Sequence, residues 1–220
     1  MNASDKHALL VNKLADLEEA EVLTMVKERV RAGEDPFGII EDAQRAMQRV
    51  GERYEQHEYY ISSMMMAGEI FREVMEIVEP VLARKASGNA SGHIVLGTVQ
   101  GDIHDIGKNI FGVLLRCHGF TVADLGVDVA PAQFVQEALR TPPDLIALSG
   151  LLTLSYDSMK ETIQRVKKLD NPLLAHTPFI IGGGTVNAMV CGFVGADYWA
   201  IDAMVGVQLC KQIVAERQKP

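Results

Sequence analysis

The spacing of the apolar residues changes once along the chain. From residue 5 to about residue 85, apolar side chains recur every three or four positions, as in amphipathic helices, and no strand-like run interrupts them. Beyond residue 92, short apolar runs alternate with stretches of helical spacing. We therefore predict two domains, residues 1–85 and 93–220, joined by a linker at 86–92, where the surrounding sequence RKASGNASG is small and polar.

The first domain is predicted to form a bundle of four helices, at residues 5–18, 20–32, 36–53 and 60–84. Gly33 and the pair Asp35-Pro36 are typical of a helix end followed by a new helix start. We interpret the run Met64 to Met66 as core packing, in which one or two of the side chains share a face.

The second domain carries five short apolar runs, at residues 93–99, 120–126, 144–150, 178–184 and 197–202. Nearly continuous apolar strands that alternate with helices are typical of a parallel sheet buried on both faces. The prediction is a doubly wound, Rossmann-like or flavodoxin-like α/β domain with five parallel strands. Ligands of such sheets bind at the carboxyl ends of the strands.

Small and polar residues follow three of these runs. His104 comes after the first run, where a neutral imidazole could ligate a metal, and Asp102 could hold the other ring nitrogen. No His, Cys or carboxylate cluster with metal-ligand spacing accompanies His104, so any further metal ligands are expected from a cofactor. Glycines 182–184 follow the fourth run and permit a close backbone approach.

Charge and cysteine content exclude several classes of protein. The 220 residues include 21 basic and 29 acidic side chains, and residues 1–85 hold 11 and 17 of these. Neither half is built to neutralise phosphates, so we expect no nucleic-acid or membrane partner. Three scattered cysteines and the lack of a secretory or membrane-spanning segment favour a cytoplasmic protein.

Three motifs carry a family resemblance. The sequence Asp102-Ile103-His104-Asp105-Ile106-Gly107 has the form D-x-H-x-x-G, and 41 residues separate it from the S-x-L motif that begins at Ser149. Gly182-Gly183 follows. With a helical segment ending in Glu79-Pro80, this order resembles the cap and cobalamin-binding domain of methionine synthase and the small corrinoid proteins of methyltransferase systems. The resemblance covers residues 20–205.

The resemblance implies a cobalamin site. His104 would be the lower axial ligand of cobalt and would displace the cofactor's own dimethylbenzimidazole, which is base-off, His-on binding. Asp102 would hydrogen-bond His104, and Ser155 would complete a relay. The resemblance assigns cofactor contacts to Asp102, Ile103, His104, Asp105, Ile106, Gly107, Ser149, Leu151, Thr153, Gly182 and Gly183, and to Tyr54 and Ile61 in the helical cap.

It also implies a methyl carrier that alternates between Co(I) and methyl-Co(III). The chain would receive a methyl group from a donor-specific methyltransferase and deliver it to an acceptor methyltransferase that uses a folate, pterin or thiol. A reductive activation protein would be a third partner. Because 220 residues leave no room for substrate barrels, we expect a stand-alone carrier without independent turnover. Methanol, methylamines, betaines and aryl methyl ethers all remain open as donors, and the oligomeric state is open too.

Two alternatives share parts of this pattern. A cobalamin-dependent sensor would join a similar cap and domain to a DNA-binding head, but residues 1–35 hold more acidic than basic side chains. The small subunit of an adenosylcobalamin mutase shares the D-x-H-x-x-G motif but does not normally bring a helical cap.

Overall fold

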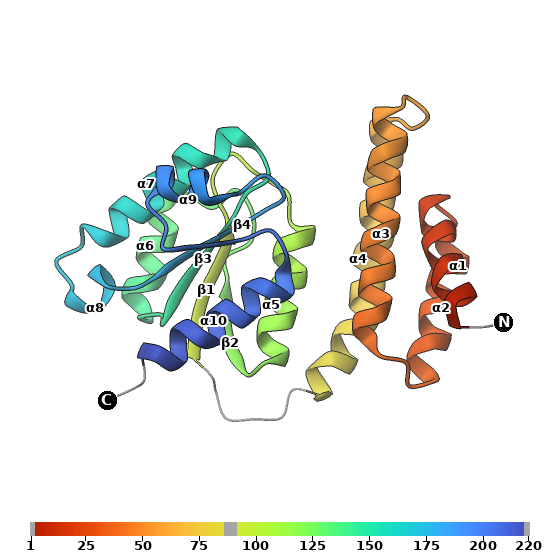
Figure 1. Ribbon diagram of the computed structural model, residues 1–220, viewed down its shortest axis with the longest axis horizontal. Helices are drawn as coiled ribbons and strands as arrows, with labels where there is room; N and C mark the ends of the chain where they lie inside the picture. Colours follow the sequence, from red (N-terminus) through yellow and green to blue (C-terminus); the bar gives the residue numbers. More distant parts are fainter. Residues whose placement is uncertain (1–2, 86–91, 218–220) are drawn as a thin grey trace. The chain divides into compact units, whose positions relative to one another are not determined.

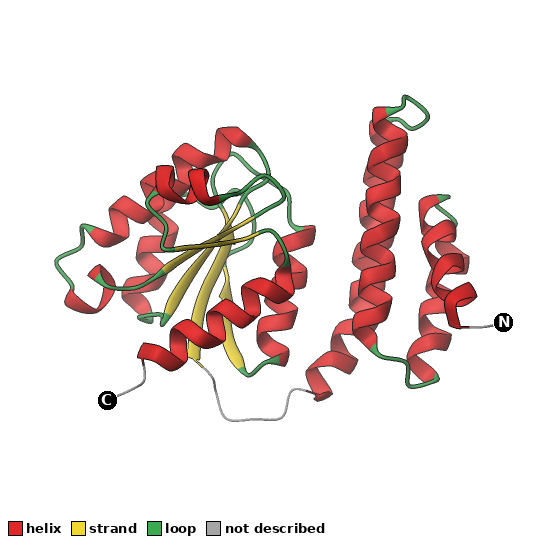
Figure 2. Cartoon of the chain, viewed as in Figure 1, coloured by secondary structure: helices red, strands yellow, loops and turns green. Residues whose placement is uncertain are grey.

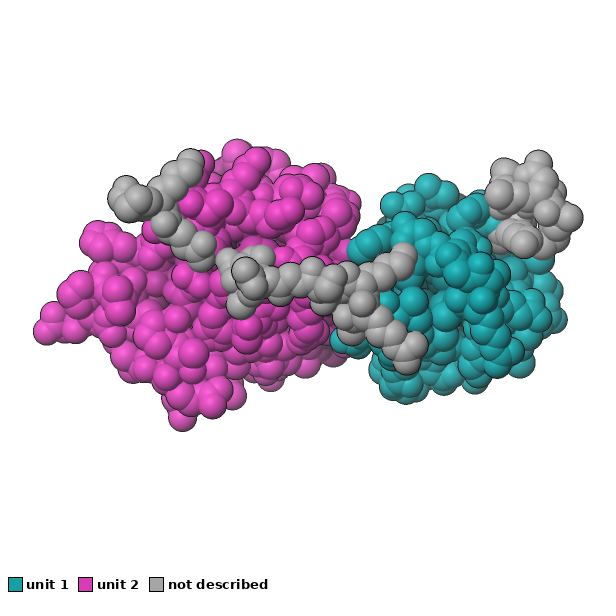
Figure 3. Space-filling model, turned by 90° about the horizontal axis from the view of Figure 1, so that it is seen from below, with its two compact units in different colours: residues 1–85 teal, residues 86–220 magenta. Residues whose placement is uncertain are grey.

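The chain folds into two compact units that divide at Lys85 (Figure 3). The computed structural model describes residues 3–85 and 92–217. The predicted linker, 86–92, lies outside the described residues apart from Gly92, at which the first strand begins. Each unit is described by itself below.

The first unit consists of four helices, as predicted. They are α1 (Ala3–Ala15), α2 (Glu19–Arg31), α3 (Pro36–Glu55) and α4 (Ile61–Lys85). Pro36 occupies the first turn of α3, where its missing N–H costs no hydrogen bond. The buried side chains lie at helical spacing, for example Ile39, Ala43 and Val50 on α3.

The methionine run does not pack as predicted. Met65 and Met66 are 72% and 43% exposed, and Met64 is half-buried. The buried face of α4 begins one position later, at Ala67 and Ile70. The helical period of α4 directs Met65 and Met66 away from the core.

A buried charged cluster joins three helices of this unit. Asp42 on α3 is 1% exposed, and its Oδ2 lies 2.8 Å from an Arg29 guanidinium nitrogen on α2 and 2.5 Å from His7 Nδ1 on α1. Arg29 also pairs with Glu34, in the turn between α2 and α3. Because buried charges are costly without partners, this cluster constrains how the three helices pack.

The second unit contains the predicted five-stranded parallel sheet (Figure 2). Its strands are β1 (Gly92–Thr98), β2 (Phe120–Asp124), β3 (Leu145–Ser149), β4 (Phe179–Gly182) and β5 (Tyr198–Ala200). They lie in the order β2-β1-β3-β4-β5, and every neighbouring pair is parallel. This order confirms the flavodoxin-like doubly wound prediction and places a topological switch point between β1 and β3.

Helices cover both faces of the sheet (Figure 1). Helices α5 (Ile106–Cys117) and α10 (Ala203–Arg217) pack together on one face. The other face carries α6 (Pro131–Arg140), α7 (Tyr156–Lys167) and α9 (Ala188–Val194), with a short α8 (Pro172–Ala175) and a 3-10 turn, η1 (Thr153–Ser155), in the connections. No described helix is both long and apolar enough to cross a membrane.

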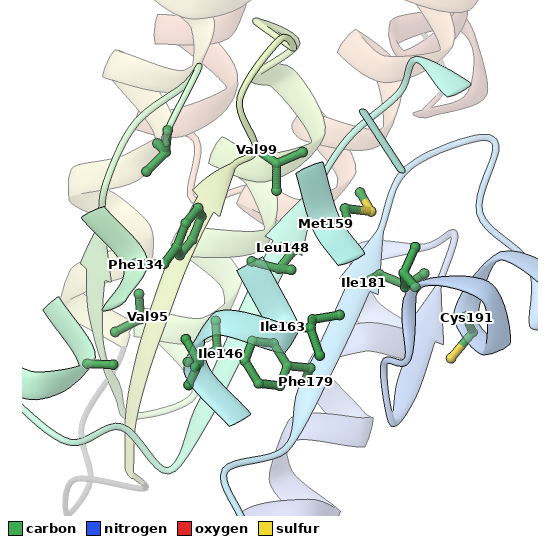
Figure 4. Packing of buried hydrophobic residues seen from close by; sticks show 14 of the residues in the cluster. Val95, Val99, Phe134, Ile146, Leu148, Met159, Ile163, Phe179, Ile181 and Cys191 are labelled. Atoms are coloured by element: carbon green, nitrogen blue, oxygen red, sulfur yellow. The ribbon is translucent and has the colours of Figure 1, made fainter. Parts of the chain in front are cut away.

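A cluster of buried apolar residues lies between the sheet and the α6, α7, α9 layer (Figure 4). Phe134 from α6 and Phe179 from β4 are fully buried in it, and Met159 from α7 lies near its carboxyl-edge end. Gly97 of β1 is needed here, because a Cβ at this position would come within 2.8 Å of the Phe134 ring. The packed core holds the ends of β1 and β3 side by side.

Candidate functional site

Two loops meet at the carboxyl edge of the sheet, at the switch point between β1 and β3. The loop after β1 spans residues 99–105, and the loop after β3 begins at Gly150. The adjacent ends of the two strands are held in register, with Thr98 opposite Ser149. The chain continues from β1 to a helix on one face of the sheet and from β3 to a helix on the other face. This divergence leaves a crevice between the two loops, where ligands of such sheets bind.

Asp102 and His104 form a hydrogen-bonded pair in the first loop. His104 Nδ1 lies 2.7 Å from Asp102 Oδ1, and the His104 backbone N–H donates to the same oxygen at 3.0 Å. The Asp102 side chain is fully buried, whereas the His104 side chain is 50% exposed. The pair therefore fixes the ring through Nδ1 and leaves Nε2 for a ligand.

The second carboxylate oxygen of Asp102 reaches the loop after β3. Asp102 Oδ2 accepts hydrogen bonds from the backbone N–H groups of Leu151 at 2.7 Å and Leu152 at 3.0 Å. Burial alone would raise the pKa of the Asp102 carboxyl, but the hydrogen bonds from Leu152, His104 and Leu151 outweigh burial and lower this pKa to about 2. Asp102 is thus a buried, ionised carboxylate that joins the two loops.

Ser155, the third member of the predicted relay, is buried below this loop. Its hydroxyl donates to the carbonyl oxygen of Leu152 at 2.6 Å. Among the described residues, no hydrogen bond joins Ser155 to Asp102 or His104. The connection from Ser155 to Asp102 runs through the backbone of Leu152, whose N–H donates to Asp102 and whose C=O accepts from Ser155.

Glycines bring the loops after β3 and β4 into close contact. Gly150 N–H donates to Gly182 O at 3.1 Å, and a Cβ at Gly183 would lie 2.0 Å from Gly150 O. Gly183 also has a φ of +145°, which favours glycine. Gly182 and Gly183, which were predicted to contact the cofactor, therefore have a structural role in building this edge of the sheet. A contact with the cofactor would be a second role.

The other predicted residues of this unit line the same edge. Ile103 is 72% exposed, Leu151 is 38% exposed, and Thr153, the first residue of the 3-10 turn, is exposed as well. Ser149 is the last residue of β3. The remaining predicted residues stand at the start of α5, namely Asp105, Ile106 and Gly107.

The two predicted cap residues belong to the helical unit. Tyr54 lies near the end of α3 and Ile61 begins α4, so the two flank one turn. Both are exposed, at 40% and 63%, and Tyr60 beside them is 75% exposed. Neither residue belongs to the loops at the carboxyl edge of the sheet. Their contact with a cofactor stays a prediction.

Sequence reasoning missed Asp128, which clamps the first loop from outside. Its carboxylate accepts from Gly101 N–H at 2.8 Å, and its own N–H donates to Asp102 O at 3.0 Å. Asp128 adopts a φ of +51°, an uncommon conformation for a non-glycine residue. The sequence feature that could have indicated Asp128 is an acidic residue in the turn after the second strand, at the same edge of the sheet.

The sequence matches a known family over most of its length. Residues 92–207 match the family described as B12 binding domain, and residues 8–79 match a second family with the same description. The chain belongs to the B12-binding family. Each of the two units therefore matches a B12 binding domain.

Several relatives of this chain are corrinoid proteins. A corrinoid protein of Desulfitobacterium hafniense is 36% identical over 174 residues, which is 78% of this chain and 80% of the relative. Trimethylamine corrinoid protein 2 of Methanosarcina acetivorans is 31% identical over 205 residues, covering 92% and 94% of the two chains. The structure of the Methanosarcina barkeri monomethylamine corrinoid protein superposes with a TM-score of 0.86 at 26% identity, covering 96% of this chain and 100% of the other.

The residues at the switch point fit the cofactor of this family. His104 presents one free ring nitrogen, and no group of three or more His, Cys, Asp or Glu side chains in the described ranges could hold a bare metal ion. One protein ligand suits a metal that arrives inside a macrocycle with its other ligands. The exposed apolar side chains of Ile103, Leu151 and Leu154 offer a surface for such a ring.

Proposed function

We propose that this corrinoid protein carries a methyl group on cobalamin between separate methyltransferases, with His104 as the lower axial ligand of cobalt. When bound, cobalamin supplies a cobalt centre that accepts a methyl group and releases it again. The chain's own residues position the cofactor. The single observation that carries the proposal is the half-exposed His104 ring, held through Nδ1 by the buried Asp102.

Asp102 would give His104 its ligand character. A carboxylate that accepts from Nδ1–H fixes the tautomer and orientation of the ring, with the Nε2 lone pair directed outward, and makes this nitrogen a stronger ligand, as in other metal sites with this pairing. The low pKa of Asp102 keeps this acceptor ionised at neutral pH. Ser155 would act on the pair indirectly, by holding the Leu152 carbonyl and with it the N–H that faces Asp102.

The cofactor's nucleotide tail would lie along the loops after β3 and β4. Ser149, Thr153 and the glycines 182–183 border this path, and Gly150 and Gly183 already approach each other closely there. With the tail in this place, His104 would hold the cobalt instead of dimethylbenzimidazole, which is base-off, His-on binding.

The partners would be one methyltransferase that donates, one that accepts, and a protein that reactivates oxidised cobalt. The relatives are named for trimethylamine and monomethylamine, which supports a methylamine as one donor class among those that the sequence leaves open. Tyr54 and Ile61 in the helical unit would shield the upper face of the cofactor between these encounters.

The test is spectroscopic. We expect apo protein reconstituted with cobalamin to show nitrogen coordination in the electron paramagnetic resonance spectrum of its Co(II) form, with a splitting that changes when histidine is isotope-labelled. His104→Ala should abolish this splitting. His176→Ala, which removes an exposed histidine after α8, is the matched control and should leave the spectrum unchanged.

Two results would contradict the proposal. One is an identical spectrum for His104→Ala and the wild type. The other is a splitting that does not respond to labelled histidine, because dimethylbenzimidazole would then remain the nitrogen ligand. The carrier role is tested separately, by methylation of the reduced, bound cofactor with a purified methyltransferase encoded beside this chain.

A further inference from the structure

A groove lined by lysines runs between α7 and α9. This open groove has a volume of about 290 Å³ and is bordered by Lys160, Lys167 and Lys168 from α7 and its end, and by Phe193 and Gly195 from α9 and its end. Ile163 contributes to its floor. We call these residues the lysine groove. It is formed by the helix layer and includes none of the residues of the strand-edge site.

The three lysines of the groove differ in their surroundings. Lys160 Nζ lies over the Phe193 ring, 4.3 Å from its centre. Lys167 Nζ lies 3.3 Å from both carboxylate oxygens of Asp197 and from the Gly195 carbonyl oxygen. Lys160 and Lys168 form no ion pair with a described residue, so the groove has two positive charges that no carboxylate neutralises.

Phe193 is the apolar element of the groove. Its neighbours Val190, Cys191 and Val194 are buried against the sheet, whereas Phe193 remains 48% exposed. The groove therefore combines the exposed apolar surface of this ring with the lysine ammonium that lies over it, an arrangement that suits a ligand with both apolar and anionic groups.

The charge of the groove contrasts with that of the whole chain. The protein carries a formal charge of −8, and the α/β half contributes −2 of it, yet this surface concentrates lysines. Arg165, on the neighbouring face of α7, is paired with Glu161 in the manner of an ordinary solvated helix surface. Lys160 and Lys168 lack that pairing among the described residues, which favours a complementary acidic partner over a solvated face.

The groove extends away from the cofactor edge. Helix α7 begins directly after Ser155, at the carboxyl edge, and ends at Lys167, which pairs with Asp197 immediately before β5. Asp197 also accepts from Phe179 N–H, at the first residue of β4. The end of the groove at Lys167 thus lies at the amino edge of the sheet, so an occupant there would leave the His104 edge accessible.

We propose that the lysine groove docks an acidic segment of a partner protein, with carboxylates at Lys160 and Lys168 and an apolar side chain against Phe193. This surface is additional to the proposed methyl-carrier site and does not depend on it. It would allow a partner to stay attached by one surface while the strand edge engages a second protein.

The test uses the full chain, isotope-labelled for NMR, and a short peptide of glutamates around a central phenylalanine as the probe. We expect saturable shifts of the backbone amides of residues 160–168 and 193–195, with a Kd below about 1 mM at low salt. Lys160→Gln/Lys168→Gln should weaken binding about tenfold, since each exposed pair contributes modestly. Phe193→Ser should also weaken it, whereas Arg165→Gln, outside the groove, should not.

Several outcomes would overturn the proposal. They are shifts that map elsewhere, equal binding of a peptide in which glutamine replaces glutamate, and unchanged affinity in the double lysine variant. Inorganic phosphate is titrated at the same ionic strength. If phosphate alone reproduces the saturable shifts, the groove is a site for small anions and the protein-docking proposal is wrong. Because apo protein serves throughout, the result is independent of cobalamin binding.

Discussion

Asp102 ties His104 to the loop after β3: Oδ1 accepts from His104 Nδ1 at 2.7 Å, and Oδ2 accepts from Leu152 N–H at 3.0 Å. Since every partner is a donor, the amide of an Asp102→Asn variant would set an N–H₂ group against at least one of them. We expect this variant to lower the free energy of unfolding of apo protein by about 1–3 kcal/mol in urea titrations. Asp105→Asn, at an exposed position, is the control, and an equal loss there would contradict the role of Asp102.

The same carboxylate should make apo-protein stability depend on pH in acid. The folded-state pKa of Asp102, about 2, lies below the ordinary 3.8, so folding favours the ionised form. Its contribution is present above pH 3.8 and is lost as pH falls through about 2. The stability difference between wild type and Asp102→Asn should therefore shrink by about 2 kcal/mol across this window. Parallel curves would show that the pKa is not lowered.

Gly183 and Gly184 offer a matched pair of substitutions. A Cβ at Gly183 would meet Gly150 O at 2.0 Å, and the residue has a φ of +145°, whereas a Cβ at Gly184 would meet only Leu151 Cδ1 at 3.5 Å. We expect Gly183→Ala to cost at least about 2 kcal/mol of unfolding free energy and to weaken cobalamin binding. Gly184→Ala should change neither by much. Urea denaturation and absorbance titration measure the two effects.

The helices and strands could be predicted because their signals are local. Apolar spacing located each helix of the first unit and each strand of the sheet to within a few residues, and strand ends pointed to the edge where His104 lies. The prediction for the methionine run was wrong because composition alone does not show which face of α4 turns to the core. The positions of the buried residues Ala67 and Ile70 define that face, and Met65 and Met66 lie outside it.

The site was predictable only as far as its motif reaches. Asp102 and His104 are two residues apart, so their pairing could be expected from sequence. The bonds from Asp102 to the Leu152 backbone and from Asp128 to Gly101 join residues far apart in the chain and use main-chain groups of no fixed identity. No local pattern encodes such contacts, which exist because the parallel strands bring their ends together.

Asp128 should be replaceable by asparagine but not by alanine. Asparagine tolerates a φ of +51° and offers an oxygen to Gly101 N–H, whereas alanine loses the acceptor and strains the backbone. We expect Asp128→Ala to cost about 1–3 kcal/mol and to speed exchange of the Gly101 amide hydrogen. Asp128→Gly, which relieves the strain alone, should fall between the two. Equal exchange rates in all variants would mean that Asp128 does not hold the loop.

Asp42 is expected to matter more to stability than any other single carboxylate of the helical unit. Its removal would leave Arg29, which is 5% exposed, with Glu34 as its remaining charged partner among the described residues, and would also remove the carboxylate that lies 2.5 Å from His7 Nδ1. Breaking a buried ion pair from one side costs about 3–5 kcal/mol, since the other charge stays desolvated. We expect Asp42→Ala to show a loss of this size in urea denaturation followed by circular dichroism. Glu41→Ala, one residue earlier on the exposed face of α3, is the control, and equal stability of the two variants would show that the cluster adds nothing to the packing of α1, α2 and α3.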